Sequence, residues 1–288
     1  MKFAHTDPPA TVDLEIPDRN LVISDTGGPF RVFVGLPSWS RQQIEGFYPK
    51  GVGSELAYYS KHFNSVELNE TFDRVFPPSQ FEKWREETPE GFLFFPKLPK
   101  EIADTGRVRG FDRLVEQFFA GISKLLEKFG AVLMQTQDDF GPYNFDRLRS
   151  FISEWDQDVP LYIELRHPGW YSDSGVTEKM CNLLKANKVG HVITDTAGRR
   201  DMMHMRLTTP FAYVRFVGSG APEIDEKRLD AWAHRIAEWK SEGLTGGFFL
   251  ILEHENRRLI DLSGSFIEKL NQQTGTRLKV PPLRPGSD

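Results

Sequence analysis

Short apolar runs alternate with helix-like stretches along most of the chain, and this alternation limits the folds that it can adopt. The apolar runs are eight in number and lie at residues 31–35, 65–68, 92–97, 131–135, 161–165, 190–194, 211–217 and 248–252. Apolar residues at helical spacing mark most of the stretches between and after them: 54–62, 79–87, 111–129, 144–155, 177–186, 225–241 and 262–272. Strands that alternate with helices indicate a parallel sheet with crossover helices.

The number of repeats favours an α/β fold of the (β/α)8 TIM-barrel type. Eight strands close such a barrel, and 31–275 is close to its typical length of about 250 residues. A doubly wound open sheet, the rival, would carry a G-x-G-x-x-G phosphate turn, which the sequence lacks. We therefore expect an irregular N-terminal arm over 1–30, a barrel over 31–275 and a C-terminal tail over 276–288. The sixth repeat is the weakest, because 195–210 has no full helical pattern.

Composition narrows the classes of partner. The chain is 39% hydrophobic with a net charge of −5, so it lacks the basic footprint of a general nucleic-acid binder, although a local basic groove stays open. No apolar run approaches the roughly 20 residues that cross a bilayer, and the N-terminal stretch is unlike a signal peptide. The single cysteine, Cys181, fits a reducing compartment. We expect a cytoplasmic protein without a membrane partner, of open oligomeric state.

The most informative single stretch is 160–170, which begins as a strand and ends in charge. Alternation along a strand places Tyr162, Glu164 and Arg166 on one face, and His167 follows directly. A carboxylate and a guanidinium on one face of an otherwise apolar strand predict that this face lines a site.

The same pattern recurs at the ends of most of the predicted strands. The polar residues at these ends are Glu67, Asn69, Lys97, Gln135, Glu164, Arg166, His167, Asp195 and Arg215. Active sites of (β/α)8 barrels lie at the C-terminal ends of the strands, so we expect these side chains to surround one charged pocket. Arginine and lysine there can hold an anionic group, and a carboxylate between them can have its pKa tuned for proton transfer. Ion pairs that tie the barrel together are the alternative for any one of these residues.

Several neighbouring residues have two open interpretations. His167 and His254 are placed for general acid–base chemistry, and a loop histidine that caps a backbone group is the alternative for His167. Trp39 and Trp170 follow strand ends and can form an aromatic wall for a ligand, with core packing as the alternative. The turn at 218–220 fits either a phosphate-binding loop or an ordinary turn.

The sequence assigns no metal and no cofactor. It contains no H-x-x-x-H or H-E-x-x-H pattern and no clustered cysteine and histidine spacing. The cations expected at the strand ends would also repel a divalent ion.

A set of motifs in the order found here resembles the YecE-like family of uncharacterised proteins. The motifs are Val34-Gly35, Ser38-Trp39, Phe47-Tyr48-Pro49, Phe63-Asn64-Ser65-Val66-Glu67-Leu68-Asn69-Glu70-Thr71-Phe72, Leu133-Met134-Gln135, Glu164-Leu165-Arg166-His167-Pro168-Gly169-Trp170 and Tyr213-Val214-Arg215. The resemblance implies a TIM barrel with a polar pocket at the strand C-termini and no known reaction. The chain departs from the family pattern at Val217-Gly218, where the family has His-Gly, so the resemblance implies no mechanism that needs that imidazole.

Three functional hypotheses follow. The first is a metal-independent enzyme acting on a small anionic substrate, phosphorylated or carboxylated. Its catalytic candidates are Glu164, Glu67, His167 and Asp195. Its substrate-binding candidates are Lys97, Arg166, Arg215, Asn69, Gln135, Trp39 and Trp170. The alternatives are a metal-dependent phosphoesterase acting on nucleic acid and a non-catalytic barrel that binds a metabolite.

Overall fold

The computed structural model describes residues 15–17, 28–107, 110–252 and 258–282, and these divide into two compact units. The first unit comprises Met1–Val66, Ile193–Met205 and Pro210–Asp288, and the second comprises Glu67–Val192 and Arg206–Thr209. Most of the predicted N-terminal arm, the end of the predicted tail and His254 lie outside the described residues. The predicted domain boundaries stay predictions.

The first unit contains a parallel sheet in the order β2-β1-β9-β8-β7. The strands are β1 (Arg31–Leu36), the first half of β2 (Ser65–Leu68), β7 (Ile193–Asp195), β8 (Phe211–Val217) and β9 (Gly246–Leu252). Register is set by pairs such as Arg31 with Gly246 on one side of β9 and Phe211 with Gly246 on the other. The near-continuous apolar sequence of β8 and β9 is typical of parallel strands buried on both faces.

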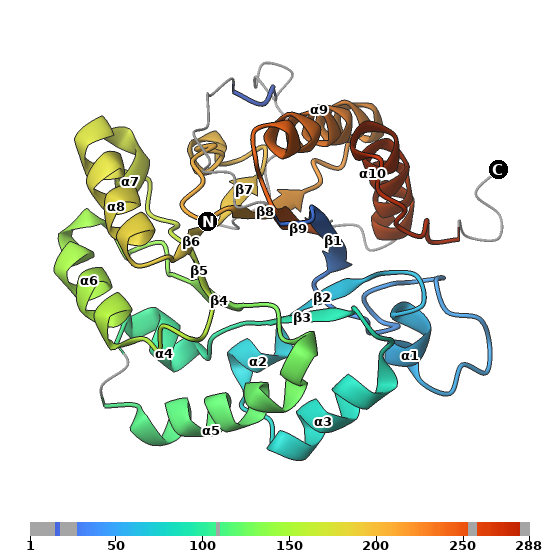
Figure 1. Cartoon of the computed structure of the whole chain (residues 1–288), viewed down its shortest axis with the longest axis horizontal. Helices are drawn as coiled ribbons and strands as arrows, with labels where there is room; N and C mark the ends of the chain where they lie inside the picture. The colour runs from blue at the N-terminus through green and yellow to red at the C-terminus, as the bar shows by residue number, and fades with distance from the viewer. Residues whose placement is uncertain (1–14, 18–27, 108–109, 253–257, 283–288) are drawn as a thin grey trace. The chain divides into compact units, whose positions relative to one another are not determined.

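Two long helices cover this sheet and lie side by side, α9 (Pro222–Ser241) and α10 (Leu259–Thr274) (Figure 1). Phe249 of β9 is the centre of the packing. Its ring stacks on Phe266 of α10 at 4.1 Å between centroids and meets Trp232 of α9 edge-on at 5.6 Å. The unit also contains helix α1 (Glu55–Tyr59) and the 3-10 turn η3 (Arg200–Met202), which is all that stands in the weak sixth repeat.

The second unit continues β2 from Glu67 and adds β3 (Leu93–Pro96), β4 (Val132–Gln135), β5 (Leu161–Glu164) and β6 (Gly190–His191). The last three form a parallel sheet in the order β4-β5-β6. Its helices and 3-10 turns are α2 (Glu70–Asp73), α3 (Pro78–Glu87), α4 (Lys100–Thr105), α5 (Asp112–Ile122), η1 (Ser123–Lys128), η2 (Pro142–Asn144), α6 (Phe145–Glu154), α7 (Gly169–Ser172) and α8 (Ser174–Ala186).

The chain therefore has the predicted mixed α/β fold with parallel sheets, but the closed (β/α)8 barrel is not confirmed, because the sheet is not closed. Among the described residues, β3 and β4 are joined only by isolated bridges, Phe94 with Phe129 and Lys97 with Leu133. The backbone N–H of Lys97 donates to Leu68 of β2, and that of Leu98 donates to Leu133 of β4. Successive N–H groups of a strand point to alternate sides, so an N–H at position 96 would point toward β4. Proline has no N–H, and Pro96 therefore cannot make this hydrogen bond.

The predicted helix over 111–129 is shorter than expected. It ends as α5 at Ile122 and continues as the 3-10 turn η1, in which Leu126 has a φ of 49°. The helix cannot continue to residue 129, because the Gly130 N–H donates to the carbonyl oxygen of Phe94 in β3 at 2.8 Å.

Candidate functional site

Three polar side chains of the second unit share one face of its strands. Leu133 of β4 pairs with Tyr162 of β5 and with Lys97. Paired residues of a parallel ladder lie on the same face, and so do residues two apart along a strand. Gln135, which pairs with Glu164, therefore lies on the face that carries Lys97. The structure brings Lys97, Gln135 and Glu164 together at the strand ends.

Glu164 and Arg166 form the charged centre of this face. The Arg166 Nη2 atom lies 3.5 Å from Glu164 Oε2; the carboxylate is fully buried and the arginine side chain is 17% exposed. The backbone around them is fixed by Thr136, whose N–H donates to the Glu164 carbonyl (3.0 Å) and whose hydroxyl accepts from the Arg166 N–H (3.3 Å). A buried carboxylate beside a partly exposed guanidinium suits a site in which an anion binds next to a proton-transfer group.

Lys97 is buried at the end of β3, and its ammonium lies 4.3 Å from the centroid of the Phe72 ring. The Thr71 hydroxyl bonds the carbonyl oxygens of both Leu68 and Lys97, each at 2.7 Å, which ties the ends of β2 and β3 together. These constraints order the backbone from which the Lys97 side chain extends.

Glu67 and Asn69 belong to the same strand end. Glu67 is fully buried in β2, and Asn69 follows it as the first residue before α2, with its N–H 3.0 Å from the Glu67 carbonyl oxygen. A short strand that passes directly into a helix places both side chains near the end of β2.

Tyr162 occupies the same face one pair further from the strand end. A Cβ at Gly190, its partner in β6, would lie 2.1 Å from the tyrosine ring, so the glycine leaves the space that the ring fills. Burial raises the pKa of Tyr162, whose hydroxyl lies 3.1 Å from the Thr209 hydroxyl.

His167 and Trp170 show the structural alternatives that the sequence left open. The Nδ1 atom of His167 accepts a hydrogen bond from the Gly169 N–H at 3.0 Å, the backbone cap of a loop histidine. Trp170 is fully buried, and its indole N–H donates to the Phe140 carbonyl at 2.6 Å. Both side chains therefore hold the loop after β5 in place.

The first unit contains the other predicted residues, and Asp195 there is heavily engaged. Its Oδ1 atom is within 2.8 Å of Arg228 Nη2 and pairs with Arg200, and its Oδ2 atom accepts from the Trp232 indole at 2.8 Å. Asp195 and Arg228 are both almost wholly buried. A carboxylate that is held by three donors braces β7 against α9.

Asp225 extends this network and contacts the turn at 218–220, for which the sequence left two interpretations. Its carboxylate accepts from the backbone N–H of Ser219 at 2.9 Å, from the Ser219 hydroxyl at 2.8 Å and from Arg228 at 2.9 Å. The donors that a phosphate would use are thus occupied by a carboxylate of the same unit, which favours the ordinary turn.

The sequence interpretation missed Arg228, Asp225 and Trp232, all on α9. Charged residues on a helix are usually solvated, and nothing local to α9 indicates that Arg228 reaches Asp195, a residue 33 positions earlier. Of the remaining candidates, Arg215 is buried in β8 and pairs with Thr194 and Leu250, and Trp39 accepts a hydrogen bond at its carbonyl from the Tyr48 hydroxyl.

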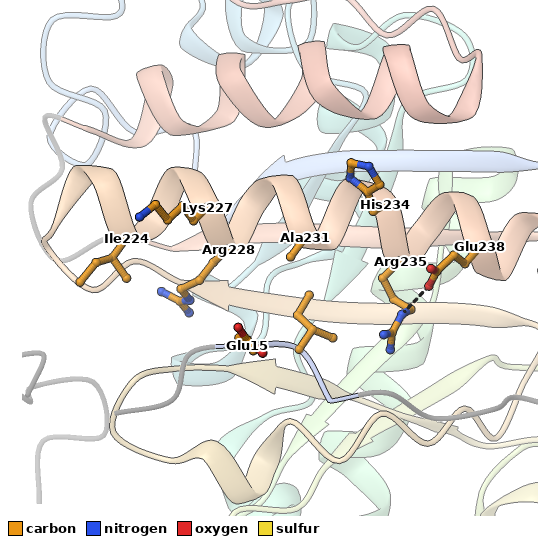
Figure 2. A pocket seen from close by; sticks show the side chains of 9 residues that line it. Glu15, Ile224, Lys227, Arg228, Ala231, His234, Arg235 and Glu238 are labelled. Atoms are coloured by element: carbon orange, nitrogen blue, oxygen red, sulfur yellow. Dashed lines mark hydrogen bonds and ion pairs between the residues drawn. The ribbon is translucent and has the colours of Figure 1, made fainter. Parts of the chain in front are cut away.

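A cavity of about 580 Å³ lies in the first unit between α9 and residues 15–17. Figure 2 shows Arg228 and Arg235 pointing from α9 toward the segment that carries Glu15. Arg235 Nη1 donates to the Pro17 carbonyl at 2.8 Å, and Arg200 Nη2 donates to the Glu15 carbonyl at 2.9 Å. Ala231 also lines the cavity, and its short side chain leaves room between the two longer arginines.

Among the described residues there is neither a metal-binding cluster nor a membrane-spanning helix. Nowhere in the described ranges do three or more histidine, cysteine, aspartate or glutamate side chains gather as a metal would require. The helices within those same ranges include none with the length and apolar character needed to span a membrane.

Comparison with known families and proteins gives a consistent result. The model of the family described as "Protein of unknown function DUF72" matches residues 33–285. The UPF0759 protein YecE of Escherichia coli K12 is 28% identical over 229 residues, which cover 72% of this chain and 82% of that protein. The UPF0759 protein YunF of Bacillus subtilis 168 is 31% identical over 180 residues, covering 57% and 60% of the two chains.

Solved structures of the same family share the fold. A DUF72 family protein of Enterococcus faecalis V583 superposes with a TM-score of 0.67 at 18% identity and covers 86% of this chain and 99% of its own. A DUF72 family protein of Thermotoga maritima MSB8 gives a TM-score of 0.58 at 19% identity, with coverage of 83% and 99%.

Proposed function

The chain belongs to the DUF72 family, whose function is unknown, and we propose that it is an enzyme acting on a small phosphorylated or carboxylated substrate. The single observation that carries the proposal is the common face of Lys97, Gln135 and Glu164, with Arg166 beside the glutamate. Ligands of parallel α/β sheets bind at the carboxyl ends of the strands, whether or not the sheet closes. The proposed site lies wholly in the second unit.

Lys97 and Arg166 are the proposed anion-binding groups. Lys97 supplies a compact ammonium, and Arg166 supplies a planar guanidinium that matches a carboxylate or a phosphate. Buried charges contribute little net stability, because their desolvation offsets their attraction. An anionic ligand would therefore gain binding free energy from Lys97 and Arg166, because the fold has already ordered these cations.

Glu164 is the proposed general acid or base, and Gln135 and Asn69 orient the ligand. The carboxylate is fully buried at the strand end, and its neighbour Arg166 is the more exposed partner. An anion that binds Arg166 would come close to the Glu164 carboxylate, which is the geometry that proton transfer requires. Glu67, buried in β2 beside the strand that carries Lys97, is the second candidate for this role.

A screen of phosphorylated and carboxylated metabolites by thermal shift, followed by NMR detection of product, tests the proposal. We expect an anionic compound to stabilise the wild type and to lose at least about tenfold in affinity with Arg166→Met, the effect of one charge-assisted contact. Glu164→Gln should still bind that compound and fail to turn it over.

Matched substitutions in the second unit separate this effect from general loss of charge. Arg149, on α6, is 61% exposed, and Glu127 is exposed in η1, so Arg149→Met and Glu127→Gln should bind and react like the wild type. A compound that binds Arg166→Met and Lys97→Met as tightly as the wild type would refute the proposed site.

The same screen tests the other functions. Binding that depends on Arg166, with no product from any hit, would identify a non-catalytic metabolite-binding protein. Turnover that appears only after a divalent metal is added, and that extends to nucleic-acid phosphodiesters, would favour the phosphoesterase.

A further inference from the structure

A small cavity of about 150 Å³ in the first unit is lined by basic groups and by no carboxylate. It lies between the end of α1, the start of the sheet and the segment after α10, and its charged or titratable lining residues are Lys61, His62 and Lys279. The volume is several times what a single water molecule needs and is sufficient for a tetrahedral oxyanion.

The two lysines form no ion pair among the described residues. Neither Lys61 nor Lys279 lies within 4 Å of a described carboxylate oxygen, whereas several arginines of this unit, such as Arg41, Arg200 and Arg228, are paired. Lysines that line one cavity without a carboxylate create a positive potential there, and this potential attracts an anion.

The backbone on both sides of the cavity is fixed by asparagine side chains. Asn64 accepts from the Val34 N–H at 2.8 Å and donates to the Val32 carbonyl at 3.0 Å, which anchors the turn after His62 to β1. Asn271 of α10 holds Leu278 in the same way, accepting from its N–H at 2.8 Å and donating to its carbonyl at 2.9 Å. Lys279 therefore extends from an ordered segment.

His62 is held in place by aromatic contacts. Its ring lies 4.9 Å from that of Tyr58 and meets Phe47 nearly edge-on at 5.6 Å. Its buried Nδ1 atom has no hydrogen-bond partner within the described part of the chain. Burial lowers the pKa of His62, and the positive charges of Lys279 and Lys61 lower it further. An anion between these three groups would oppose both electrostatic effects.

We propose that Lys61, His62 and Lys279 form a binding site for a tetrahedral oxyanion, a phosphate or sulfate group. The site is in the first unit and shares no residue with the proposed active site of the second. The ligand is either a free anion or the terminal group of a phosphate monoester, because both present the same tetrahedral oxyanion to the three basic groups.

Titration of the full chain with sodium sulfate, followed by calorimetry and by the NMR signals of the His62 ring, tests the proposal. Sulfate keeps its charge over the range in which histidine titrates, so any pH dependence of binding reports the protein. The groups that face His62 are Lys61 beside it, Tyr58 of α1, Phe47 and Lys279. We expect saturable binding that tightens as pH falls, with a rise in the pKa of His62 on saturation.

Lys61→Gln and Lys279→Gln should each weaken sulfate binding about tenfold, whereas Lys227→Gln, at an exposed position of α9, should leave it unchanged. Both test positions are exposed, so the variants should fold normally. Equal affinity in the wild type and the Lys61→Gln/Lys279→Gln double variant, or shifts that match those caused by sodium chloride of equal ionic strength, would overturn the proposal. Parallel titrations with inorganic phosphate and glycerol phosphate distinguish a free anion from a monoester.

Discussion

Asp195 in the first unit and Glu164 in the second are both fully buried carboxylates at the end of a parallel strand, but their neighbours differ in kind. Asp195 is held by Arg228 and Trp232, which come from α9 and reach it across the unit. Glu164 contacts Arg166, which follows it by two residues at the same strand end, and 3.5 Å separate Glu164 Oε2 from Arg166 Nη2.

The difference indicates two uses of buried charge. A network that joins a strand to a helix fixes the position of both elements, and the loss of one member leaves the others buried without their partner. The ion pair between Glu164 and Arg166 lies within one strand end, so this contact does not itself join two elements. Under the proposed function, the first unit uses its strand-end carboxylate to hold the fold, and the second uses its own for proton transfer.

The largest expected effect is the loss of stability on replacing Asp195. Asp195→Asn removes the negative charge that faces Arg228 and Arg200, and breaking a buried pair in this way costs about 3–5 kcal/mol. Urea denaturation measures it. Asp230→Asn, at an exposed position on the same helix as Arg228, should change the free energy of unfolding by less than about 0.5 kcal/mol. A cost for Asp195→Asn as small as that of the control would remove the basis of the comparison.

The second-largest expected effect is the loss of stability on replacing Lys128, a buried charge that joins two elements of the second unit. The Lys128 ammonium donates to the carbonyl oxygens of Arg85 and Thr88, at 2.6 and 2.5 Å, where α3 ends. Burial lowers the pKa of Lys128 and so opposes its charged form, but Lys128→Met would leave these buried acceptors without this donor. We expect a loss of about 2 kcal/mol in the free energy of unfolding.

Lys124→Met is the matched control for Lys128→Met. Lys124 pairs with Glu82 at 3.3 Å on the surface of the same unit, and such pairs are worth about 0.5 kcal/mol. Equal losses for the two variants would show that Lys128 is not a brace.

A smaller effect is expected for the residue that we assign to chemistry. Glu164→Gln keeps the shape of the side chain, and we expect it to change the free energy of unfolding by no more than about 1 kcal/mol, because groups kept for function often do not stabilise the fold. The midpoint of urea denaturation, measured beside Asp195→Asn, gives the contrast directly. A loss as large as that of Asp195→Asn would place Glu164 in the structural class.

The sequence predicted the parts of this molecule that depend on local pattern. The run 211–217 is β8 and the run 248–252 lies in β9, because a buried parallel strand has a near-continuous apolar sequence. The grouping of Lys97, Gln135 and Glu164 followed from their common place at the C-terminal ends of predicted parallel strands. These relations require no knowledge of distant residues.

The features that the sequence did not predict depend on residues far apart in the chain. Continuous pairing of β3 with β4 needs a donor at position 96, which Pro96 lacks, and the partner strand begins 36 residues later. The Asp195 network depends on Arg228 and Trp232 of α9, a helix whose charged pattern is typical of a solvated face. The local sequence of His167 and Trp170 fits both a role in the site and a structural role, so it could not decide between them.

The smallest expected effect concerns pH and involves the first unit alone. The pKa of His62 in the folded chain is lowered, mainly by burial, so the unfolded chain binds the proton more readily. The contribution of His62 to stability is therefore retained above its unfolded pKa, about 6.5, and falls as the pH drops below that value. Denaturation midpoints measured between pH 5 and 8, in chloride buffers without sulfate or phosphate, should fall less steeply on acidification for His62→Gln than for the wild type. His234→Gln, at an exposed position on α9, is the control and should follow the wild type. Identical slopes for His62→Gln and the wild type would show that His62 is not a source of acid sensitivity, and the pH dependence would then have to come from other groups.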